Sequence, residues 1–537
     1  MMVNDRDSWT KGTGVISHTD FTTLRIVRLV NELESSGVCT SSRAWKLLLA
    51  ADRICSMGMW LTVHMTYAKR IYLDGRSLEA GDFKSDPEGH TGGALNMVPA
   101  YVGYLLANAL TGRTRAWLMG QGHSVAAIEA VNCLLRNLDN EQASRYPLSD
   151  TGLSQLCQDF YGYRVSASGK PEVPLGSHVG VYTAGGISEG GYLGFAELQY
   201  VHMPLPGQEL VTFLSDGAFE EQRGSDWSPR WWRGEDTGLV MPIMIANGRR
   251  IDQRTTMAQS GGVEWLEKHL RLNGFSPIEI DGRDPAAFAW AILTMASDLS
   301  RQTAAISEGK RQYPVQLPYT IAETTKGYGF PGAGTNSAHN LPLRGNPSAD
   351  PAARQEFNEG ATRLFIDIKA LHESCAAFSN HQEQKRELEK DHCLRHPRVE
   401  QLQFPNFDWS QKGLVKSPME QIDLWFQALA EGNPGHRFRV GNPDEMRSNR
   451  MNRTLDFLQH RVVAPEPDVT ESLTGSVITA LNEEAVVSAA LANKQGVNLV
   501  VSYEAFAVKM LGAMRQEAIF ARHFIEANRP VNWLSVP

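Results

Sequence analysis

Short apolar runs alternate with helix-like segments between residues 115 and 322, and this alternation constrains the fold more than any other feature. The strand-like runs lie at 115–119, 211–214, 239–246, 278–280 and 319–322. Segments with helical periodicity lie at 125–135 and 286–299. Strands that alternate with helices are typical of a parallel sheet with helices on both faces. We therefore predict a doubly wound α/β domain over residues 1–365.

The character of the chain changes after this domain. Residues 380–401 are dense in charge, which is typical of a solvated helix and linker, and 404–418 read as irregular connecting chain. We therefore predict a linker over 366–435. A second α/β segment follows, with strands expected at 498–501 and 531–536 and a helix at 504–525.

The second α/β segment, residues 436–537, reads as an incomplete domain. Its last expected element is a strand with no helix behind it. A parallel sheet needs cover on both faces, so we expect only part of a domain here.

The net charge and the cysteines limit the class of protein. A formal net charge of −8 argues against a general binder of nucleic acids or membrane surfaces. No apolar run approaches the ~18 residues of a membrane-spanning helix, and the first residues lack the apolar region of a signal peptide. The six cysteines show neither zinc-site nor disulfide spacing. We expect a protein of the reducing cytoplasm.

A carboxylate follows the strand-like run in ELVTFLSDGAFEEQ, residues 209–222. The run ends on Ser215, Asp216 and Gly217. A simple turn explains this ending, because Asp and Gly are common turn residues. The alternative is a ligand site, since open α/β sheets bind ligands at the carboxyl ends of their strands.

The next strand bears on this choice because it also ends on a polar residue, Asn247. The 29 residues from 218 to 246 are enough for one helical crossover between neighbouring parallel strands. Asp216 and the amide oxygen of Asn247 should therefore lie at the same edge of the sheet. With a backbone carbonyl they would form part of the octahedral oxygen shell that Mg²⁺ prefers.

This Asp-Gly … Asn spacing resembles the metal–diphosphate motif of thiamine diphosphate enzymes. The surrounding segments resemble the phosphoketolases, within the transketolase-like group of these enzymes. The similar segments run in order along nearly the whole chain: EGHTGGALNMVPAYVGYLL, WLMGQGHSVAAIEA, GSHVGVYTAGGISEGGYLGFAEL, ETTKGYGFPGAGTNSAHNLPL, NPDEMRSNRM, ALNEEAVV and VVSYEAF. The resemblance implies one complete diphosphate-binding domain and part of a pyrimidine-binding domain.

The resemblance also implies roles for individual residues. The catalytic residues would be Glu483, His90, His123 and His339. The cofactor would be held by Gly120, Gly122, His178, Glu189, Gly190, Gly191, Gly217 and Lys326. The substrate phosphate would be received by Ser448, Asn449, Arg450 and Tyr503. Mg²⁺ would be held by Asp216, Asn247 and the carbonyl of Arg249.

Each of these residues also has a purely structural explanation. A lone histidine is more often a hydrogen-bonded structural residue, although glycine-rich surroundings let the backbone approach a ligand closely. Ser188 and Glu189 could cap a helix and begin its first turn. Glu483 beside Glu484 would ordinarily be a solvated pair on a helix, and Arg450 alone a surface residue.

The activity implied by the resemblance is that of a phosphoketolase-like aldehyde-lyase. Such an enzyme uses thiamine diphosphate and Mg²⁺ to cleave xylulose 5-phosphate or fructose 6-phosphate with inorganic phosphate, and it forms acetyl phosphate and an aldose phosphate. Glu483 would act at the aminopyrimidine, which requires a buried carboxylate. The alternatives are a transketolase-type transferase and a catalytically silent, cofactor-binding subunit of a split enzyme.

The chain departs from the family pattern in three places. Ser188 replaces an expected histidine, and Ser215–Gln222 differs from the family's Gly-Asp-Gly-Glu-Ala-Glu-Thr-Gly. Family members also continue well beyond the position that corresponds to Pro537. We therefore expect a fragment or one half of a split enzyme, which works as a homodimer or with a complementary C-terminal chain.

Overall fold

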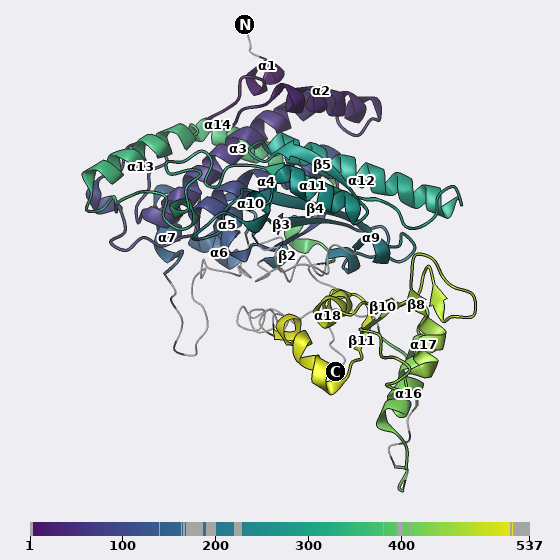
Figure 1. Ribbon diagram of the computed structural model, residues 1–537. Helices are drawn as coiled ribbons and strands as arrows, with labels where there is room; N and C mark the ends of the chain where they lie inside the picture. Colours follow the sequence, from purple (N-terminus) through teal and green to yellow (C-terminus); the bar gives the residue numbers. More distant parts are fainter. Residues whose placement is uncertain are drawn as a thin grey trace.

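The computed structural model contains two parallel β-sheets, each with its own helices and core (Figure 1). It describes residues 4–138, 140–162, 164, 167, 186–189, 200–217, 219, 228–379, 381–394, 401–406, 408, 410–413, 415–515 and 518.

The first sheet has six parallel strands in the order β2-β1-β3-β4-β6-β5. The strands are β1 (Ala116–Met119), β2 (Gly186–Glu189), β3 (Glu209–Ser215), β4 (Leu239–Ala246), β5 (Phe275–Asp281) and β6 (Leu317–Glu323). The apolar side chains of the central strands β3 and β4 are almost entirely buried, as expected for a parallel sheet covered on both faces. The predicted α/β fold with a parallel sheet is confirmed.

Long helices pack around this sheet. The buried helix α4 (Thr91–Thr111) contacts α3 (Ser41–Tyr67), α5 (Val125–Leu135) and α12 (Pro285–Ser307). The helix α12 also packs against β4, β5 and β6. Asp284 and Pro285 explain where α12 begins, because the Asp284 carboxylate accepts a hydrogen bond from the amide of Ala286 over 2.9 Å and proline suits the first helical position.

The remaining helices of this region are shorter or more peripheral. The helices α1 and α2 lie at the end of the molecule opposite the second sheet (Figure 1). The bounds are α1 (Asp5–Trp9), α2 (Asp20–Ser35), α6 (Asn140–Arg145), α7 (Asp150–Asp159), α9 (Ser228–Trp231), α10 (Thr256–Gln259), α11 (Val263–Leu272), α13 (Pro351–Leu364), α14 (Ile368–Phe378) and α15 (His381–Gln384). Short 3₁₀ turns include η2 (Gly122–Ser124), η3 (Tyr200–His202) and η6 (Ser337–His339).

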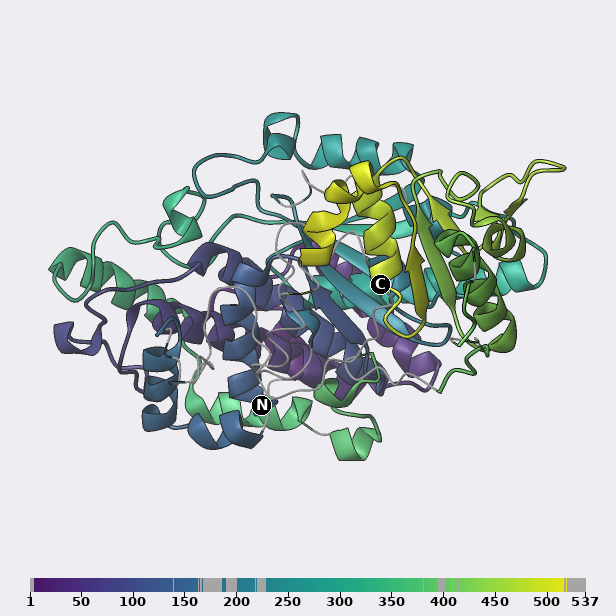
Figure 2. The ribbon, with the colours of Figure 1, turned by 90° about the horizontal axis from the view of Figure 1, so that it is seen from below.

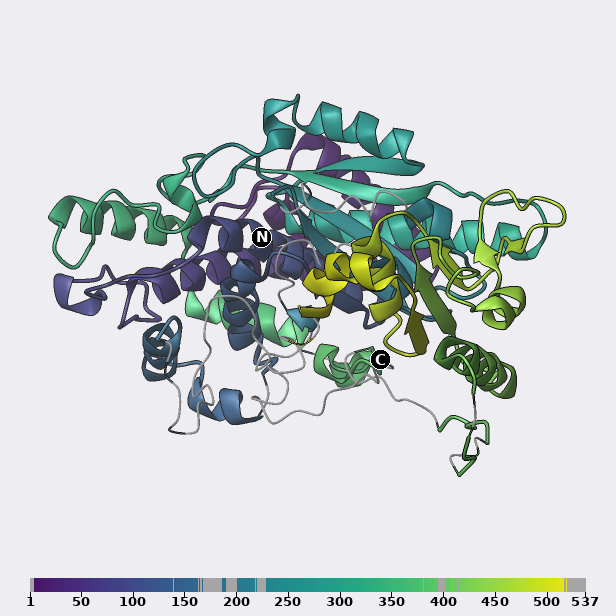
Figure 3. The same cartoon turned by 60° about the horizontal axis from the view of Figure 1, so that its bottom comes forward.

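The second sheet has five parallel strands in the order β11-β7-β10-β8-β9. The strands are β7 (Phe438–Asn442), β8 (His460–Arg461), β9 (Glu471–Ser472), β10 (Val477–Thr479) and β11 (Val497–Val500). The helices are α16 (Pro418–Gly432), α17 (Asn452–Leu458), α18 (Glu483–Leu491) and α19 (Glu504–Ala507), with a 3₁₀ turn η8 (Val508–Met510). Figures 2 and 3 show this second domain lying against the first.

The structure differs from the expected elements in two places, and two further expectations fall partly or wholly outside the described residues. Residues 186–189 form a strand and not the start of a helix. The described part of the crossover between β3 and β4 contains only the four-residue helix α9. The helix expected over 504–525 is interrupted by η8 at 508–510. The strand expected at 531–536 lies outside the described residues.

The expectation of a solvated helix at 380–401 is wrong for its first part. Arg386 and Glu389 are buried, and they pair over 2.6 Å. Arg386 also donates to Thr114 Oγ1 over 3.1 Å, and His381 lies 2.9 Å from Glu389. These charged residues pack onto the first domain because they neutralise one another there.

None of the described helices combines the length and apolar character needed to cross a membrane.

Candidate active site

The carboxyl ends of β3 and β4 bring Asp216 and Asn247 to the same edge of the first sheet. The two strands pair in parallel register along their length. The backbone amide of Gly248 donates a hydrogen bond to Asp216 Oδ2 over 2.6 Å, and Asp216 is buried. Gly248 has a φ of 75°, a left-handed conformation that favours glycine. The juxtaposition expected from the spacing is therefore present.

Asn247 is held in place by hydrogen bonds at both ends of its side-chain amide. Its Oδ1 accepts from the backbone amide of Arg249 over 3.1 Å, and its Nδ2 donates to Asn96 Oδ1 over 3.3 Å. Asn96 is a buried residue of α4, and its Nδ2 donates to the carbonyl of Thr325 over 2.8 Å. The turn after β4 is thus tied both to α4 and to the segment after β6.

Lys326 lies beside this turn with its ammonium group directed toward it. Its Nζ donates to the carbonyl of Arg249 over 3.0 Å and to that of Arg250 over 3.3 Å. The same Nζ lies 2.7 Å from His339 Nδ1. Burial lowers the pKa of Lys326 to about 8, and the nearby Asp216 carboxylate opposes this shift. At neutral pH the ammonium is therefore mostly protonated and can donate to His339.

Three predicted histidines, His90, His123 and His339, form one cluster beside Lys326. The ring centroids of His90 and His123 are 5.5 Å apart, those of His90 and His339 5.5 Å, and those of His123 and His339 5.2 Å. The rings come from three separate places: the position before α4, the turn η2 and the turn η6. Burial, Lys326 and His90 lower the pKa of His339 to about 3, so its ring is neutral at pH 7.

Glycines at the start of α4 make room for this cluster. A Cβ at Gly93 would lie 3.0 Å from His123 Nε2 and 2.9 Å from Ser124 Oγ. A Cβ at Gly92 would lie 2.3 Å from the carbonyl oxygen of Ala338, which precedes His339. The glycine pair therefore lets η2 and η6 approach the helix closely.

The donors at the edge of the sheet suit a divalent cation bound to a diphosphate. Burial raises the pKa of Asp216 to about 7, although the Gly248 amide and Lys326 oppose the shift. A buried carboxylate with so little compensation favours a bound cation. The Asp216 carboxylate, the Asn247 amide oxygen and the Arg249 carbonyl are hard oxygen donors of the kind that Mg²⁺ takes. These residues therefore fit the group that the resemblance implies.

The other predicted cofactor residues are described only in part. Gly120 follows β1 and its amide donates to the carbonyl of Phe213 over 2.9 Å, while Gly122 begins η2. Gly217 follows Asp216, and an added Cβ there would meet only ordinary contacts, the nearest 3.6 Å away. Glu189 is the last residue of β2. The predicted residues His178, Gly190 and Gly191 lie outside the described residues.

Three of the four residues predicted to receive the substrate phosphate contact Glu445 of the second domain. Ser448 Oγ donates to the Glu445 carbonyl over 3.2 Å, and Asn449 Nδ2 donates to it over 2.8 Å. The carboxylate of Glu445 accepts from the backbone amide of Tyr503 over 2.8 Å. Arg450 has a φ of 61° and pairs over 2.7 Å with Glu420, and both side chains are exposed.

Glu483 lies apart from the histidine cluster, in the second domain. It is the first residue of α18, where Asn482 caps the helix by accepting from the amide of Ala485 over 3.0 Å. Glu483 is buried, and its Oε1 lies 3.0 Å from Lys509 Nζ. The expectation of a buried carboxylate is met, whereas an ordinary solvated Glu483–Glu484 pair is not found.

A second group with metal-ligand atoms lies elsewhere, at His18, Asp52 and Asp284, whose ligand atoms lie within 4.8 Å of one another. His18 Nε2 lies 3.0 Å from Asp52, and His18 Nδ1 lies 2.8 Å from Asp284. Burial alone would lower the pKa of His18, but the hydrogen bonds and charges of Asp284 and Asp52 raise it to about 10. Both ring nitrogens are thus protonated and engaged, so we interpret this group as an ion-paired imidazolium.

Two residues of the site were not singled out from the sequence. Asn96 and Glu445 both stand within segments that carry the family resemblance. Asn96 is a buried polar residue in a mostly apolar helix, and that contrast is a sequence signal for it, although Asn108 of the same helix shows the same contrast. Glu445 offered no such signal, because its role depends on a contact with residue 503.

Family models match most of the chain. The "XFP N-terminal domain" matches residues 46–362, and "D-xylulose 5-phosphate/D-fructose 6-phosphate phosphoketolase" matches residues 420–537. The chain belongs to the phosphoketolase family.

Individual phosphoketolase relatives are distant in sequence. A probable phosphoketolase of Mycolicibacterium paratuberculosis is 27% identical over 463 residues, which cover 80% of this chain and 56% of the relative. One from Rhodopseudomonas palustris is 26% identical, with 68% of this chain and 49% of the relative covered. The chain spans about half the length of the curated relatives it matches.

Solved structures of transketolases share the fold of this phosphoketolase family member. A transketolase variant from Pichia stipitis superposes with a TM-score of 0.50 at 15% identity, covering 88% of this chain and 67% of the other. A transketolase from Leishmania mexicana gives a TM-score of 0.51 at 17% identity, with coverage of 88% and 66%. The fold is therefore transketolase-like.

Proposed function

We propose that this chain is the thiamine diphosphate-binding and catalytic part of a phosphoketolase-like lyase. The reaction would convert a ketose phosphate and inorganic phosphate into acetyl phosphate, an aldose phosphate and water. The observation that carries the proposal is the histidine cluster (His90, His123 and His339), joined through Lys326 to the oxygen donors beside Asp216. It is supported by membership of the phosphoketolase family.

The cofactor site would combine a metal end and a diphosphate end. Asp216, Asn247 and the Arg249 carbonyl would hold Mg²⁺. Lys326 would pair with the diphosphate, together with backbone groups at Gly120 and Gly122 and the predicted residues His178, Glu189, Gly190, Gly191 and Gly217. When bound, thiamine diphosphate supplies the electron sink for breaking the bond between C2 and C3 of the ketose.

The histidine cluster would move protons on the hydroxyl groups of the substrate. His339 is neutral at pH 7, because burial and the Lys326 ammonium lower its pKa to about 3. If Lys326 donates to its Nδ1, the ring carries its proton on Nε2, which can be offered to a substrate oxygen. His90 and His123 lie in ring contact with it and would accept protons in turn.

The second domain would contribute Glu483 and the phosphate-binding loop. Glu483 would act at the aminopyrimidine of the cofactor as a proton-transfer group. Ser448, Asn449, Arg450 and Tyr503 would receive the sugar phosphate, with Arg450 offering a bidentate guanidinium. Arg450 now pairs with exposed Glu420, and such a pair is worth only about 0–1 kcal/mol, so a phosphate can displace it.

Two alternatives remain to be separated by experiment. A transketolase-type transferase would pass the two-carbon unit to an aldose. A catalytically silent, cofactor-binding subunit would bind thiamine diphosphate without forming either product. We propose a homodimer, or an assembly with a chain that supplies the remaining part, in the reducing cytoplasm.

The test is a product assay with the purified chain, thiamine diphosphate, Mg²⁺ and phosphate. Xylulose 5-phosphate and fructose 6-phosphate are supplied separately, and acetyl phosphate is measured with and without an added aldose phosphate. Acetyl phosphate without an acceptor supports the lyase, whereas a product only with the aldose supports the transferase. The assay is repeated with the C-terminal part of a longer phosphoketolase added, and no product in either case supports the silent subunit.

A further inference from the structure

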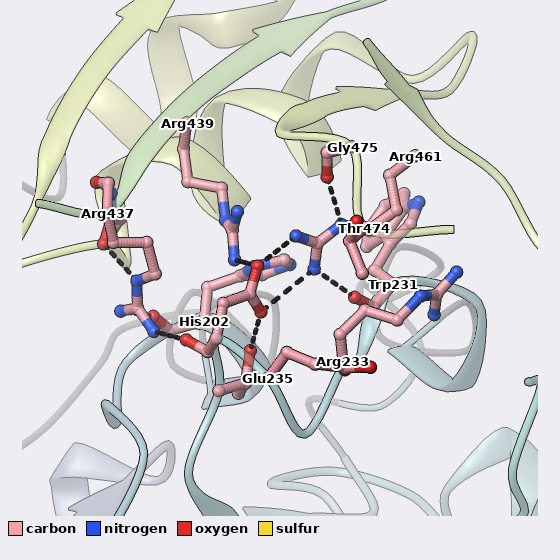
Figure 4. A network of polar contacts seen from close by, with 12 residues as sticks. His202, Trp231, Arg233, Glu235, Arg437, Arg439, Arg461, Thr474 and Gly475 are labelled. Atoms are coloured by element: carbon pink, nitrogen blue, oxygen red, sulfur yellow. Dashed lines mark hydrogen bonds and ion pairs between the residues drawn. The ribbon is translucent and has the colours of Figure 1, made fainter. Parts of the chain in front are cut away.

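The second domain meets the first through a group that we call the interdomain arginine cluster. It consists of Arg437, Arg439 and Arg461 of the second domain, and Arg233 and Asp236 of the first. Figure 4 shows its four arginines. All four arginines are buried. Buried guanidinium groups are costly unless their charges and donors are satisfied. The partners of each arginine therefore show what holds the two domains together.

Arg437 satisfies its donors with backbone carbonyls of the first domain. Its Nη1 donates to the carbonyls of Pro204 and Asp236, each over 2.8 Å, and its Nη2 donates to that of Met203 over 3.2 Å. Its Nε donates over 2.6 Å to Asn493, which belongs to its own domain. Asn493 of the second domain thus orients the Arg437 guanidinium, and backbone carbonyls of the first domain accept its other hydrogen bonds.

Arg233 makes the reciprocal contact from the first domain. Its Nη2 donates to the carbonyl of Val462 over 2.9 Å, and its Nε donates to the carbonyl of Leu473. Both carbonyls belong to the second domain. The hydrogen bonds of Arg233 and Arg437 fix the contact, but carbonyl groups carry no net charge to balance the arginines.

Asp236 supplies the negative charge. Its Oδ2 lies 2.7 Å from Arg439 Nη2 and also pairs with Arg461 Nη2. Burial alone would raise the pKa of Asp236, but Arg461 and Arg439 outweigh it and hold the pKa well below its usual range. The carboxylate is therefore ionised at neutral pH and bridges two strands, β7 and β8.

The buried His202 beside these arginines adds no further positive charge. Burial, followed by Arg439, Arg461 and Arg437, lowers the pKa of His202 well below its usual range, so the ring is neutral. Arg233 feels the negative charge of both Asp236 and Glu235. Arg439 and Arg461, by contrast, pair with the carboxylate of Asp236. Loss of that carboxylate would leave Arg439 and Arg461 buried without a counter-charge.

We propose that Asp236 is a positioning residue that holds the second domain in one orientation on the first. The orientation of the second domain sets the positions of Glu483 and of the loop at Glu445 relative to the first domain. The effect of these positions on catalysis rests on the proposed function. The docking of the second domain on the first does not rest on the proposed function, because it follows from the contacts of β7 and β8 with Asp236.

The test compares Asp236→Asn with a matched control, Asp456→Asn, in the full chain. Asp456 pairs with Arg447 in the second domain, but both side chains are more than half exposed, at 59% and 51%. Amide hydrogen exchange is measured by mass spectrometry for residues 437–442 and 460–461. We expect exchange there to be at least about 100-fold faster in D236N, because the buried Arg439 and Arg461 have lost their counter-charge. The D456N control should exchange like the wild type.

The pattern of exchange decides the outcome. Unchanged exchange at 437–442 and 460–461 in D236N would overturn the proposal. An equal acceleration in β1 and β3 would overturn it as well, because it would indicate general destabilisation. If D236N does not fold, Asp236→Glu is measured in its place. This variant keeps the negative charge but moves it outward by one methylene group, and unchanged exchange at 437–442 and 460–461 would again overturn the proposal. Thiamine diphosphate titration of each variant reports on the cofactor site separately, so a failure of the proposed function leaves the exchange result valid.

Discussion

Lys326 Nζ lies 2.7 Å from His339 Nδ1 and also donates to the Arg249 carbonyl over 3.0 Å. One ammonium group therefore joins the histidine cluster to the oxygen donors proposed for Mg²⁺. A cation bound at the Arg249 carbonyl would take over an oxygen that Lys326 now uses. The two halves of the site are thus electrostatically coupled.

Replacing Lys326 should change the titration of His339. In Lys326→Met the pKa of His339 should rise, because one of the positive charges that lower it is removed. Imidazole NMR of labelled histidine measures this shift, and Lys369→Met, at an exposed position, is the control. A His339 pKa that stays at about 3 in K326M would show that Lys326 does not contribute to it.

Asp216 should be required for metal-dependent cofactor binding. In Asp216→Asn the affinity for thiamine diphosphate in the presence of Mg²⁺ should fall by more than about 10-fold, because a charged oxygen ligand is lost. Calorimetric titration with and without Mg²⁺ measures the effect. The control is Asp252→Asn, an exposed neighbour. Equal affinities of D216N and wild type would exclude Asp216 as a ligand.

Metal binding should depend on pH through the same carboxylate. The pKa of Asp216 is raised to about 7, so below pH 7 a proton must leave before the metal binds. Mg²⁺ affinity should fall by up to about tenfold per pH unit below 7 and level off above it. Calorimetric titrations in buffers of different ionisation enthalpy measure how many protons are released when Mg²⁺ binds. If no proton is released at pH 6.5, Asp216 is already ionised there and the prediction is wrong.

His18 should stabilise the first domain by pairing with Asp52 and Asp284. His18→Gln should lower the free energy of unfolding by about 3 kcal/mol or more, because both buried carboxylates lose their counter-charge. The raised pKa means that this contribution is fully present below pH ~6.5 and is lost as pH rises through about 10.

Denaturant unfolding at pH 6 and above pH 10 tests this pH dependence. The difference between wild type and H18Q should shrink at the higher pH. His372→Gln, at an exposed position, serves as the control. A difference that does not vary with pH would mean that His18 acts through packing against Trp9, whose ring centroid is 3.9 Å away.

Glu483 should be needed for catalysis, whereas Lys509 should contribute little to stability, although the two residues form one ion pair. Glu483→Gln should reduce product formation by about 100-fold or more, the usual range for a proton-transfer group. Lys509→Met should change stability by less than about 1 kcal/mol, because the Lys509 side chain is 57% exposed. The assay of the proposed function measures the first effect and denaturant unfolding the second. Equal product formation by E483Q and wild type would remove Glu483 from the catalytic residues.

The sequence predicted several elements closely. The bounds of α5 (Val125–Leu135) and β4 (Leu239–Ala246) agree with the expected ones. The register of β3 and β4 places Asp216 beside the turn at Gly248, as the spacing indicated. Apolar periodicity and short-range spacing suffice for such predictions, because they depend on neighbours along the chain.

The tertiary structure alone determined which of the charged residues are buried. Arg386 and Glu389 belong to a stretch that was predicted to be solvated, yet both are buried, and Arg386 contacts Thr114, far away in the sequence. Asp236 likewise pairs with the distant Arg439. A charge leaves water only when a partner compensates for the lost hydration, and the sequence does not show which partner folding brings. The amino-acid sequence by itself therefore determined the parallel α/β architecture and the order of the site segments. The fold determined which charges became buried contacts, because that depends on distance in space.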